Sequence, residues 1–259
     1  MPSSVSRDAV PGRAPSTAHE VSARLIQIYG EDPAGLPGLT HIVATARGHH
    51  GALHALRIGP HAPKSATDFF LLQAVRARVD AIVTTAANLR AEPELVHDFV
   101  GESSSALAEY RRDTALKTQP LEVFILTQSG ELPDTHPVWQ DSARKHVLAP
   151  THALSQVKAR VPSHVSVHGL DALDLRAAVA FVNARGHHAV SLEAGPTLAR
   201  TAYGEDCIVD ELCLSTYLGT DLTPLSLGGA LPDDAVLFGD KSLTVLPIEI
   251  EDWLFYRYL

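Results

Sequence analysis

The sequence predicts an α/β protein with a mostly parallel sheet, helices on both faces of the sheet, and an antiparallel C-terminal extension. Short apolar runs such as residues 80–84 and 122–127 alternate with segments of helical periodicity. Apolar runs of this length are typical of parallel strands that are buried on both faces, and the helices between them make the crossovers. The last third of the chain predicts strands without long helices between them, at residues 208–216, 243–250 and 253–258.

Periodicity and capping residues place the individual elements. We expect further strands at residues 40–46, 146–149, 165–168 and 188–192. We expect helices at residues 18–29 and 154–160, one that begins after Ser65, and one between Asp171 and Gly186. Ser65 and Asp171 have the side chains that cap helix N-termini, whereas Gly30 and Gly186 stand where a helix would end. The result is one alternating series of helices and strands.

The chain is expected to form a single domain that follows a short tail. Residues 1–17 are rich in Ser, Pro and Arg and contain few large apolar side chains, so they cannot repay the entropy of ordering. Residues 18–259 carry the periodic pattern, and a chain of 259 residues is near the upper size of one α/β domain. We therefore predict a disordered tail at 1–17 and one domain at 18–259.

Charge, hydropathy and cysteine content exclude several classes of partner. The formal net charge is −9, so no general positive field attracts a nucleic acid. No stretch approaches the eighteen or so apolar residues of a membrane span, and the N-terminus has no apolar signal segment. Cys207 and Cys213 form neither a disulfide framework nor a zinc motif. We expect a cytoplasmic protein that binds neither nucleic acid nor membrane.

Three segments, in order along the chain, resemble the reductase domain of the riboflavin-biosynthesis deaminase-reductases and their stand-alone pyrimidine reductase relatives. The first comprises Ser65-Ala66-Thr67-Asp68, Val75-Arg76, Asp80-Ala81-Ile82-Val83 and Arg90-Ala91-Glu92-Pro93. The second is Glu193-Ala194-Gly195-Pro196-Thr197-Leu198, similar to the family's EGGPTL, and the third is Val209-Asp210-Glu211-Leu212, which matches its VDEL strand. The resemblance spans roughly residues 18–259. The zinc signature of the deaminase domain, HxE…PCxxC, is not found.

The resemblance implies a dihydrofolate-reductase-like fold and an NADPH-dependent reductase. The substrate it implies is a small molecule, a ribosylamino-pyrimidine phosphate or a related heterocycle, to which the cofactor transfers a hydride. In this family two turns that follow strands meet the dinucleotide, where backbone N–H groups approach the pyrophosphate. Relatives commonly pair through their final strands, so a homodimer is expected as well.

Carried onto this sequence, the resemblance assigns three sets of site residues. The cofactor-binding residues are Thr85, Ala86, Asn88, Arg90, Ala194, Gly195, Pro196, Thr197 and Leu198. The catalytic residues are Glu193, Asp68 and Arg47, and the substrate-binding residues are Thr45, Ser65 and Arg76. Each catalytic residue also has an alternative interpretation. Glu193 could be an N-cap or turn partner of the following helix, and Asp68 could be a carboxylate that favours the first turn of its helix. Arg47 could be a solvated turn residue.

Several positions depart from the family pattern and motivate a second hypothesis. Thr85 and Ala87 stand where glycines are usual, Ala194 replaces the first glycine of GG, and Arg47 stands where an aspartate is expected. A β-branched residue such as Thr85 would be strained if its position required a positive φ. The alternative to a reductase is therefore a non-catalytic relative that keeps the fold and acts as a binding or assembly module.

The histidine pairs invite a metal-site hypothesis, which the spacing does not support. His49-His50 and His187-His188 lack the HExxH arrangement, and adjacent side chains on a strand point to opposite faces. Ser129-Gly130 and the segment around Gly228-Gly229 also lack the GxSxG motif of a serine hydrolase. We expect no metal site, and we place Gly228-Gly229 in a turn or in a loop beside the cofactor groove.

Overall fold

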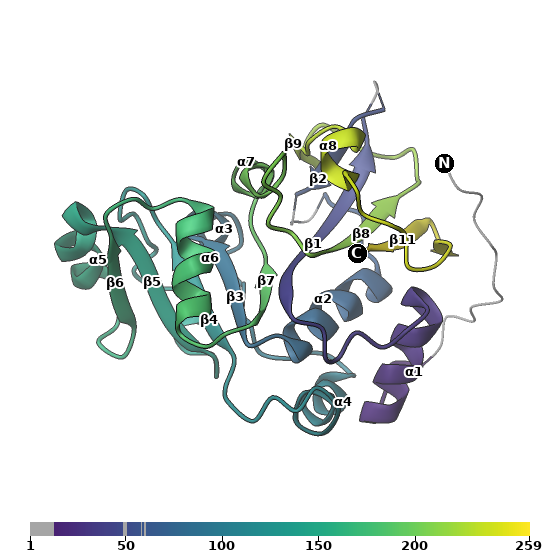
Figure 1. The fold of residues 1–259 in the computed structure, drawn as a ribbon, viewed down its shortest axis with the longest axis horizontal. Coiled ribbons are helices and arrows are strands. Elements are labelled where there is room, and N and C mark those ends of the chain that lie inside the picture. Colours follow the sequence, from purple (N-terminus) through teal and green to yellow (C-terminus); the bar gives the residue numbers. More distant parts are fainter. Residues whose placement is uncertain (1–12, 49–50, 58, 60) are drawn as a thin grey trace.

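A β-sheet organises the molecule, and its strands follow an order that differs from the order in the chain. This computed structural model describes residues 13–48, 51–57, 59 and 61–259, and within these ranges the sheet has 11 strands. The order across the sheet is β10-β11-β8-β1-β7-β3-β4-β5-β6, and β2 and β9 branch from β1 (Figure 1). Residues 1–12 of the expected tail and the pair His49-His50 lie outside the described residues.

Seven neighbouring strands run parallel and form the centre of the sheet. They are β1 (Gly38–Arg47), β3 (Ala81–Thr85), β4 (Glu122–Leu126), β5 (Arg144–Pro150), β6 (Ser166–Leu170), β7 (Ala189–Leu192) and β8 (Glu211–Tyr217). β1 pairs in parallel with both β7 and β8, and β3 joins β7 to β4. The parallel centre predicted from the apolar runs is therefore confirmed.

The antiparallel strands lie at one edge of the sheet and in the branch. The branch is formed by β2 (Leu53–Leu56) and β9 (Leu227–Ala230), and the edge by β10 (Ile248–Ile250) and β11 (Trp253–Tyr258). β11 pairs antiparallel with β8, and β10 with β11. The strand expected at residues 243–250 is shorter, because only its last three residues join β11, while Leu243 makes an isolated bridge to Tyr258. The antiparallel C-terminal extension is confirmed for β10 and β11. The strand expected at residues 208–216 is β8, which runs parallel to β1 and belongs to the centre of the sheet. β2 and β9 were not predicted.

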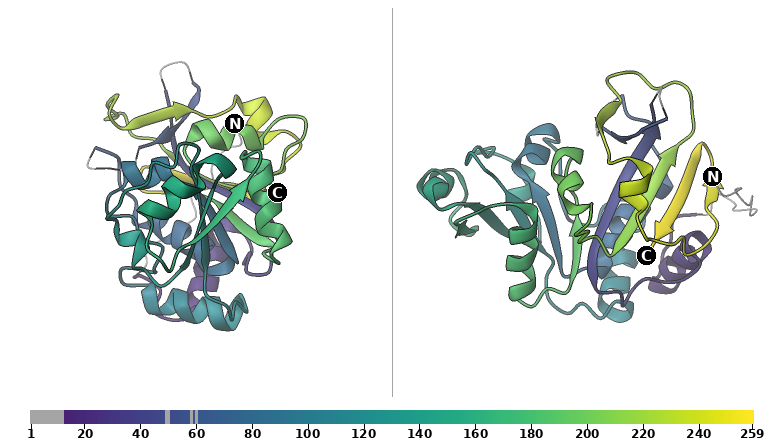
Figure 2. Two further views of the ribbon diagram at one scale, coloured as in Figure 1. Left: turned by 90° about the vertical axis from the view of Figure 1, so that its left-hand side faces the viewer. Right: turned by 45° about the horizontal axis from the view of Figure 1, so that its top comes forward.

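Helices cover both faces of the sheet, as expected, and each face has its own apolar core. One face packs against α1 (Ala18–Tyr29), α2 (Ala66–Arg78), α3 (Ala86–Ala91), α4 (Ser104–Glu109) and α5 (Leu154–Arg160). The other packs against α6 (Leu175–Ala184), α7 (Pro196–Ala199) and α8 (Asp234–Phe238) (Figures 1 and 2). No helix in the described ranges is long and apolar enough to cross a membrane. Two cores on one continuous sheet suit one domain, which stays a prediction.

Capping explains where the helices begin and end, with one correction. Ser65 Oγ accepts a hydrogen bond from the backbone N–H of Asp68 at the start of α2, and Gly30 ends α1 with φ of 81°. The prediction that Asp171 caps α6 is wrong. Asp174 is the cap, because its carboxylate accepts from the N–H of Ala177 at 2.7 Å.

A buried network of charged side chains connects β8 to α2, to β1 and to the C-terminal strand β11. Glu211 of β8 accepts from Arg78 of α2, from Arg257 of β11 at 2.5 Å, and from Thr40 of β1 at 2.7 Å. The side chains of the three charged residues are at most 3% exposed. Removal of one partner of such a network leaves an uncompensated buried charge, so loss of any one of the three should destabilise the fold.

Candidate functional site

The two turns predicted to meet a cofactor lie side by side. They follow β3 and β7, which are adjacent parallel strands, so both turns emerge at the carboxyl edge of the sheet (Figure 1). Asn88 of α3 donates from Nδ2 to the backbone carbonyl of Glu193 at 2.9 Å. Gly195 is next to the same amide, since a Cβ built on it would lie 3.7 Å from Asn88 Oδ1. Ligands of open α/β folds bind at this edge.

The turn after β3 forms without strain. Thr85 has φ of −129° and caps α3, with its Oγ1 accepting from the N–H of Asn88 at 3.1 Å. The condition under which Thr85 would be strained is therefore not met, because the position does not require a positive φ. Ala86 is buried in the core, whereas Arg90 is exposed and donates to the carbonyl of Glu131 at 2.6 Å.

The turn after β7 is equally regular. Gly195 has φ of −59°, Pro196 occupies the first turn of α7, and the carbonyl of Gly195 accepts from the N–H of Leu198. Thr197 is exposed, while Ala194 and Leu198 pack against the core on the α6 face. Neither turn needs the family's missing glycines for its backbone conformation, and a Cβ on Gly195 would meet only Asn88 Oδ1, at an ordinary contact distance of 3.7 Å.

β9 approaches the second turn closely. A Cβ on Gly229 would lie 2.9 Å from Cγ of Pro196, which is closer than real Cβ contacts come. Gly228 is similarly close to the carbonyl of Ala55 in β2. The two glycines, expected in a turn or a flanking loop, thus form part of a strand that runs beside α7 (Figure 1).

Glu193 is held by a buried ion pair. Arg76 of α2 donates to its two carboxylate oxygens at 2.9 and 2.7 Å, and to the carbonyl of Val96 at 3.0 Å. The side chains of Arg76 and Glu193 are 5% and 10% exposed. Burial alone would raise the pKa of Glu193, but the charge and hydrogen bonds of Arg76 outweigh it and lower the pKa. Burial, and then the charge of Glu193, raise the pKa of nearby Glu92 to about 7.

Of the residues predicted to meet the substrate, Asp68 and Thr45 lie against β8, whereas Ser65 caps a helix. Asp68 and Thr45 both reach β8: Thr45 Oγ1 donates to the carbonyl of Ser215 at 3.0 Å, and Asp68 is hydrogen-bonded to the Ser215 side chain. Burial raises the pKa of Asp68, and the bond to Ser215 partly offsets it. The hydroxyl oxygens of Thr45 and Thr216 are 3.1 Å apart. Ser65 is the cap of α2, so its hydroxyl is used by the helix itself.

Arg47 faces a different neighbour. Its guanidinium contacts Asp234 of α8 at 3.3 Å and donates to the carbonyl of Gly51 at 2.5 Å. The Arg47 side chain is 31% exposed, and it lies at the end of β1 where the β2 branch begins. The pairing with Asp234 was not predicted.

Three residues near the site were not assigned to it from the sequence: Glu92, Ser215 and Thr216. Glu92 belongs to the Arg90-Ala91-Glu92-Pro93 segment that resembles the family, and a carboxylate that follows a short helix after a strand is a usable signal for a site residue. Ser215 and Thr216 are hydroxyl-bearing residues at the end of an apolar strand, which is a second usable signal. Nothing in the sequence indicates that Gly229 lies against Pro196.

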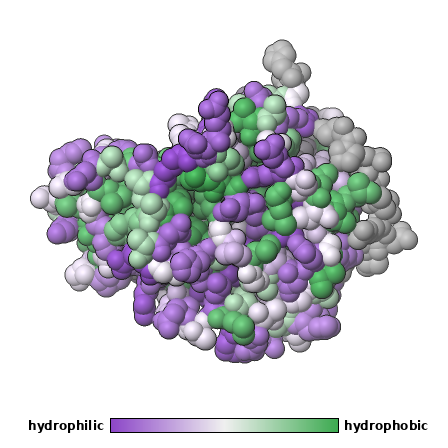
Figure 3. Space-filling model, in the orientation of Figure 1, coloured by the Kyte–Doolittle hydropathy of each residue, from purple (hydrophilic) through white to green (hydrophobic). Residues whose placement is uncertain are grey.

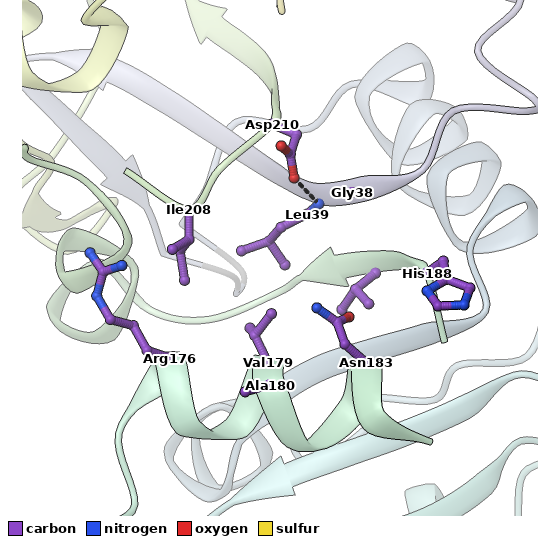
Figure 4. A pocket seen from close by; sticks show the side chains of 10 residues that line it. Gly38, Leu39, Arg176, Val179, Ala180, Asn183, His188, Ile208 and Asp210 are labelled. Carbon is purple, nitrogen blue, oxygen red and sulfur yellow. Dashed lines mark hydrogen bonds between the residues drawn. The ribbon is translucent and has the colours of Figure 1, made fainter. Parts of the chain in front are cut away.

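Two cavities in the described residues lie at the opposite, amino edge of the sheet. The larger, of about 420 Å³, is lined by apolar side chains that include Leu39 and Val179, and also by Asn183 of α6 and His188 (Figure 4). In the orientation of Figure 1, the surface also shows apolar side chains in a hollow near the middle of the view (Figure 3). The second cavity, of about 390 Å³, is more polar. Because the strands begin there, neither cavity coincides with the site at the carboxyl edge.

The histidines form a cluster on the outer part of the sheet. His146 and His187 each place Nε2 3.0 Å from the same Glu122 oxygen, and Nδ1 of His146 lies 3.1 Å from Nε2 of His168. Burial lowers the pKa of His146 to about 4. Among the residues that the structure describes, no three His, Cys, Asp or Glu side chains form a group that could hold a metal ion.

Comparisons with known proteins agree with this architecture. The RibD C-terminal domain family matches residues 44–244. A pyrimidine reductase-like protein from Corynebacterium diphtheriae is 20% identical with a TM-score of 0.58, over 93% of this chain and 98% of that one. The riboflavin biosynthesis reductase Rib7 of Saccharomyces cerevisiae is 12% identical with a TM-score of 0.57, over 91% and 97%. No curated protein matches the sequence.

A longer protein shares the same fold over part of its length. The diaminohydroxyphosphoribosylaminopyrimidine deaminase/5-amino-6-(5-phosphoribosylamino)uracil reductase of Thermotoga maritima is 17% identical with a TM-score of 0.56. The alignment covers 86% of this chain but only 56% of the Thermotoga protein. At these identities the likeness establishes the fold, which is the dihydrofolate-reductase-like fold expected from the sequence.

Proposed function

This chain belongs to the RibD C-terminal domain family of riboflavin-pathway reductases, and on that premise we propose that it is an NADPH-dependent reductase. The proposed substrate is a ribosylamino-pyrimidine phosphate or a related heterocycle, and the proposed location is the cytoplasm. The observation that carries the proposal is the junction of two strand-end turns through Asn88 and Glu193. It brings together, at the ligand-binding edge of the sheet, the two segments that a dinucleotide would need.

The residues divide into a cofactor side and a substrate side. Residues 85–88 and 194–198 would hold NADPH, which when bound supplies a hydride. Asp68 would meet the substrate, because its carboxyl is half-buried at the start of α2 beside Ser215 and its pKa is raised. A carboxyl with a raised pKa keeps a proton to a higher pH, so it can donate a hydrogen bond to a hydroxyl or a ring nitrogen.

Two of the expected catalytic residues take other roles in this proposal. Glu193 is committed to Arg76 through both carboxylate oxygens, so we assign it to positioning of the turn after β7. Arg47 is paired with Asp234, so an anionic substrate group would have to compete with that carboxylate. Thr45 precedes Arg47 by two positions on β1, and its hydroxyl is within hydrogen-bond distance of Thr216 on β8.

Direct measurement of cofactor binding tests the proposal. NADPH binding would be followed by its fluorescence and by thermal shift, since a ligand at ~100 times its Kd adds about 2.7 kcal/mol of stability. Gly195→Val should weaken binding, because the side chain enters the open space beside Asn88. Gly35→Val is the matched control, since a Cβ at Gly35 meets nothing within 4 Å. A wild type that binds neither NADPH nor NADH would contradict the reductase and favour the non-catalytic binding module.

We further propose that the chain forms a homodimer through β10. This strand is at the edge of the sheet and has only β11 as a neighbour in the described structure. An open edge that carries isoleucines is a template for pairing with another strand. A monomer in light scattering at micromolar concentration would refute this part of the proposal.

A further inference from the structure

The side chain of Asn88 connects three segments of the site. Its Nδ2 donates to the Glu193 carbonyl at 2.9 Å and lies 3.4 Å from Thr84 Oγ1, while its Oδ1 accepts from Thr85 Oγ1 at 3.3 Å. The amide therefore bridges the end of β3, the start of α3 and the turn after β7. The helix cap does not need this amide, because Thr85 Oγ1 caps α3 through the backbone N–H of residue 88.

Glu193 is fixed at each of its polar groups. Its N–H donates to the carbonyl of Val83 at 2.9 Å, its carboxylate is held by Arg76, and its carbonyl accepts from Asn88. The first two contacts set the strand and the side chain. The third is the contact nearest to Gly195, whose open side faces Asn88 Oδ1. The amide thus connects the two turns directly, two residues before Gly195.

We propose that Asn88 is a positioning residue of the cofactor site. By tying the carbonyl of Glu193 to the β3–α3 junction, it holds the backbone of residues 193–195 at a fixed distance from residues 84–88. Recognition by backbone groups requires placement to within a fraction of an ångström, so loss of the tie should weaken dinucleotide binding even though Asn88 carries no charge. This inference rests on the proposed function, because it concerns the same site.

The test compares Asn88→Ala with the matched control Asn183→Ala. Asn183 is an exposed asparagine on α6, at the amino edge of the sheet and away from both turns. Titration with NADPH should give a Kd about tenfold higher for Asn88→Ala, the upper range expected for loss of a hydrogen bond, and an unchanged Kd for the control. Hydrogen exchange of residues 193–198 in the free protein should accelerate in Asn88→Ala only, with little change in the thermal midpoint.

The two readouts separate failure of this inference from failure of the proposed function. If the wild type binds NADPH and Asn88→Ala binds it within twofold, the positioning role is overturned. Unchanged exchange at residues 193–198 overturns it as well, whether or not the wild type binds NADPH. If the wild type binds no NADPH, the reductase proposal fails by itself. Should Asn88→Ala not fold, Asn88→Ser removes the amide with less disturbance and is judged by the same criteria.

Discussion

The buried pair between Arg76 and Glu193 gives the sharpest test of how the site is built. Glu193→Ala removes a carboxylate that accepts two hydrogen bonds and leaves the guanidinium buried without its counter-charge. With charge centres roughly 4 Å apart and an effective dielectric constant of about 20, the lost attraction is ~4 kcal/mol. Measured losses for removal of one partner of a buried pair are about 3–5 kcal/mol, so the two magnitudes agree.

Thermal and denaturant unfolding would measure this loss. For a chain of this size each 1 kcal/mol lowers the thermal midpoint by about 2–4 °C, so Glu193→Ala should lower it by roughly 6–20 °C. The double variant Arg76→Met, Glu193→Leu should recover most of the stability, because it removes both charges together. Asp113→Ala breaks an ion pair whose two side chains are 63% and 50% exposed, and it should leave the midpoint unchanged.

The outcome also decides the role of Glu193. A loss below about 1 kcal/mol for Glu193→Ala would refute the structural role, because that is the range of exposed pairs. It would also mean that the carboxylate is free to act on a ligand. A large loss that the double variant repairs would assign Glu193 to the scaffold of the cofactor site.

Three further predictions concern the rest of the chain. In the folded protein the pKa of His146 is lowered from its ordinary 6.5 to about 4, so between pH 6.5 and pH 4 the unfolded state binds more protons than the folded state. The free energy of unfolding should therefore fall by up to about 3 kcal/mol from pH 7 to pH 4. His146→Gln should flatten this pH profile in urea titrations, whereas the same change at exposed His188 should not. Asp174→Ala should cost about 1 kcal/mol as the α6 cap and Asp171→Ala much less; equal losses would contradict the assignment. Limited proteolysis should trim the N-terminal tail and leave one resistant core, and two stable halves would refute the single domain.

Local sequence signals were sufficient for most of the fold. Apolar runs flanked by turn residues identified the parallel strands, because a strand covered on both faces must be apolar throughout. α1 and α5 match their predicted bounds, since capping and periodicity are local effects. The adjacency of the two turns of the candidate site also followed from the sequence through the family resemblance. β2 and β9 escaped prediction because neither is a continuous apolar run: β2 has a histidine within its four residues, and two of the four residues of β9 are glycines.

The sequence by itself determined the α/β architecture, the order of its elements and the two turns of the site. Only the tertiary structure decided which charges pair. Arg76 and Glu193 are 117 positions apart, and they meet because the crossovers place β7 beside β3 under α2. Arg47 meets Asp234 across 187 positions, which turned an expected site residue toward α8. A side chain's type shows that it can form an ion pair, but its partner depends on strand order, which long-range packing fixes.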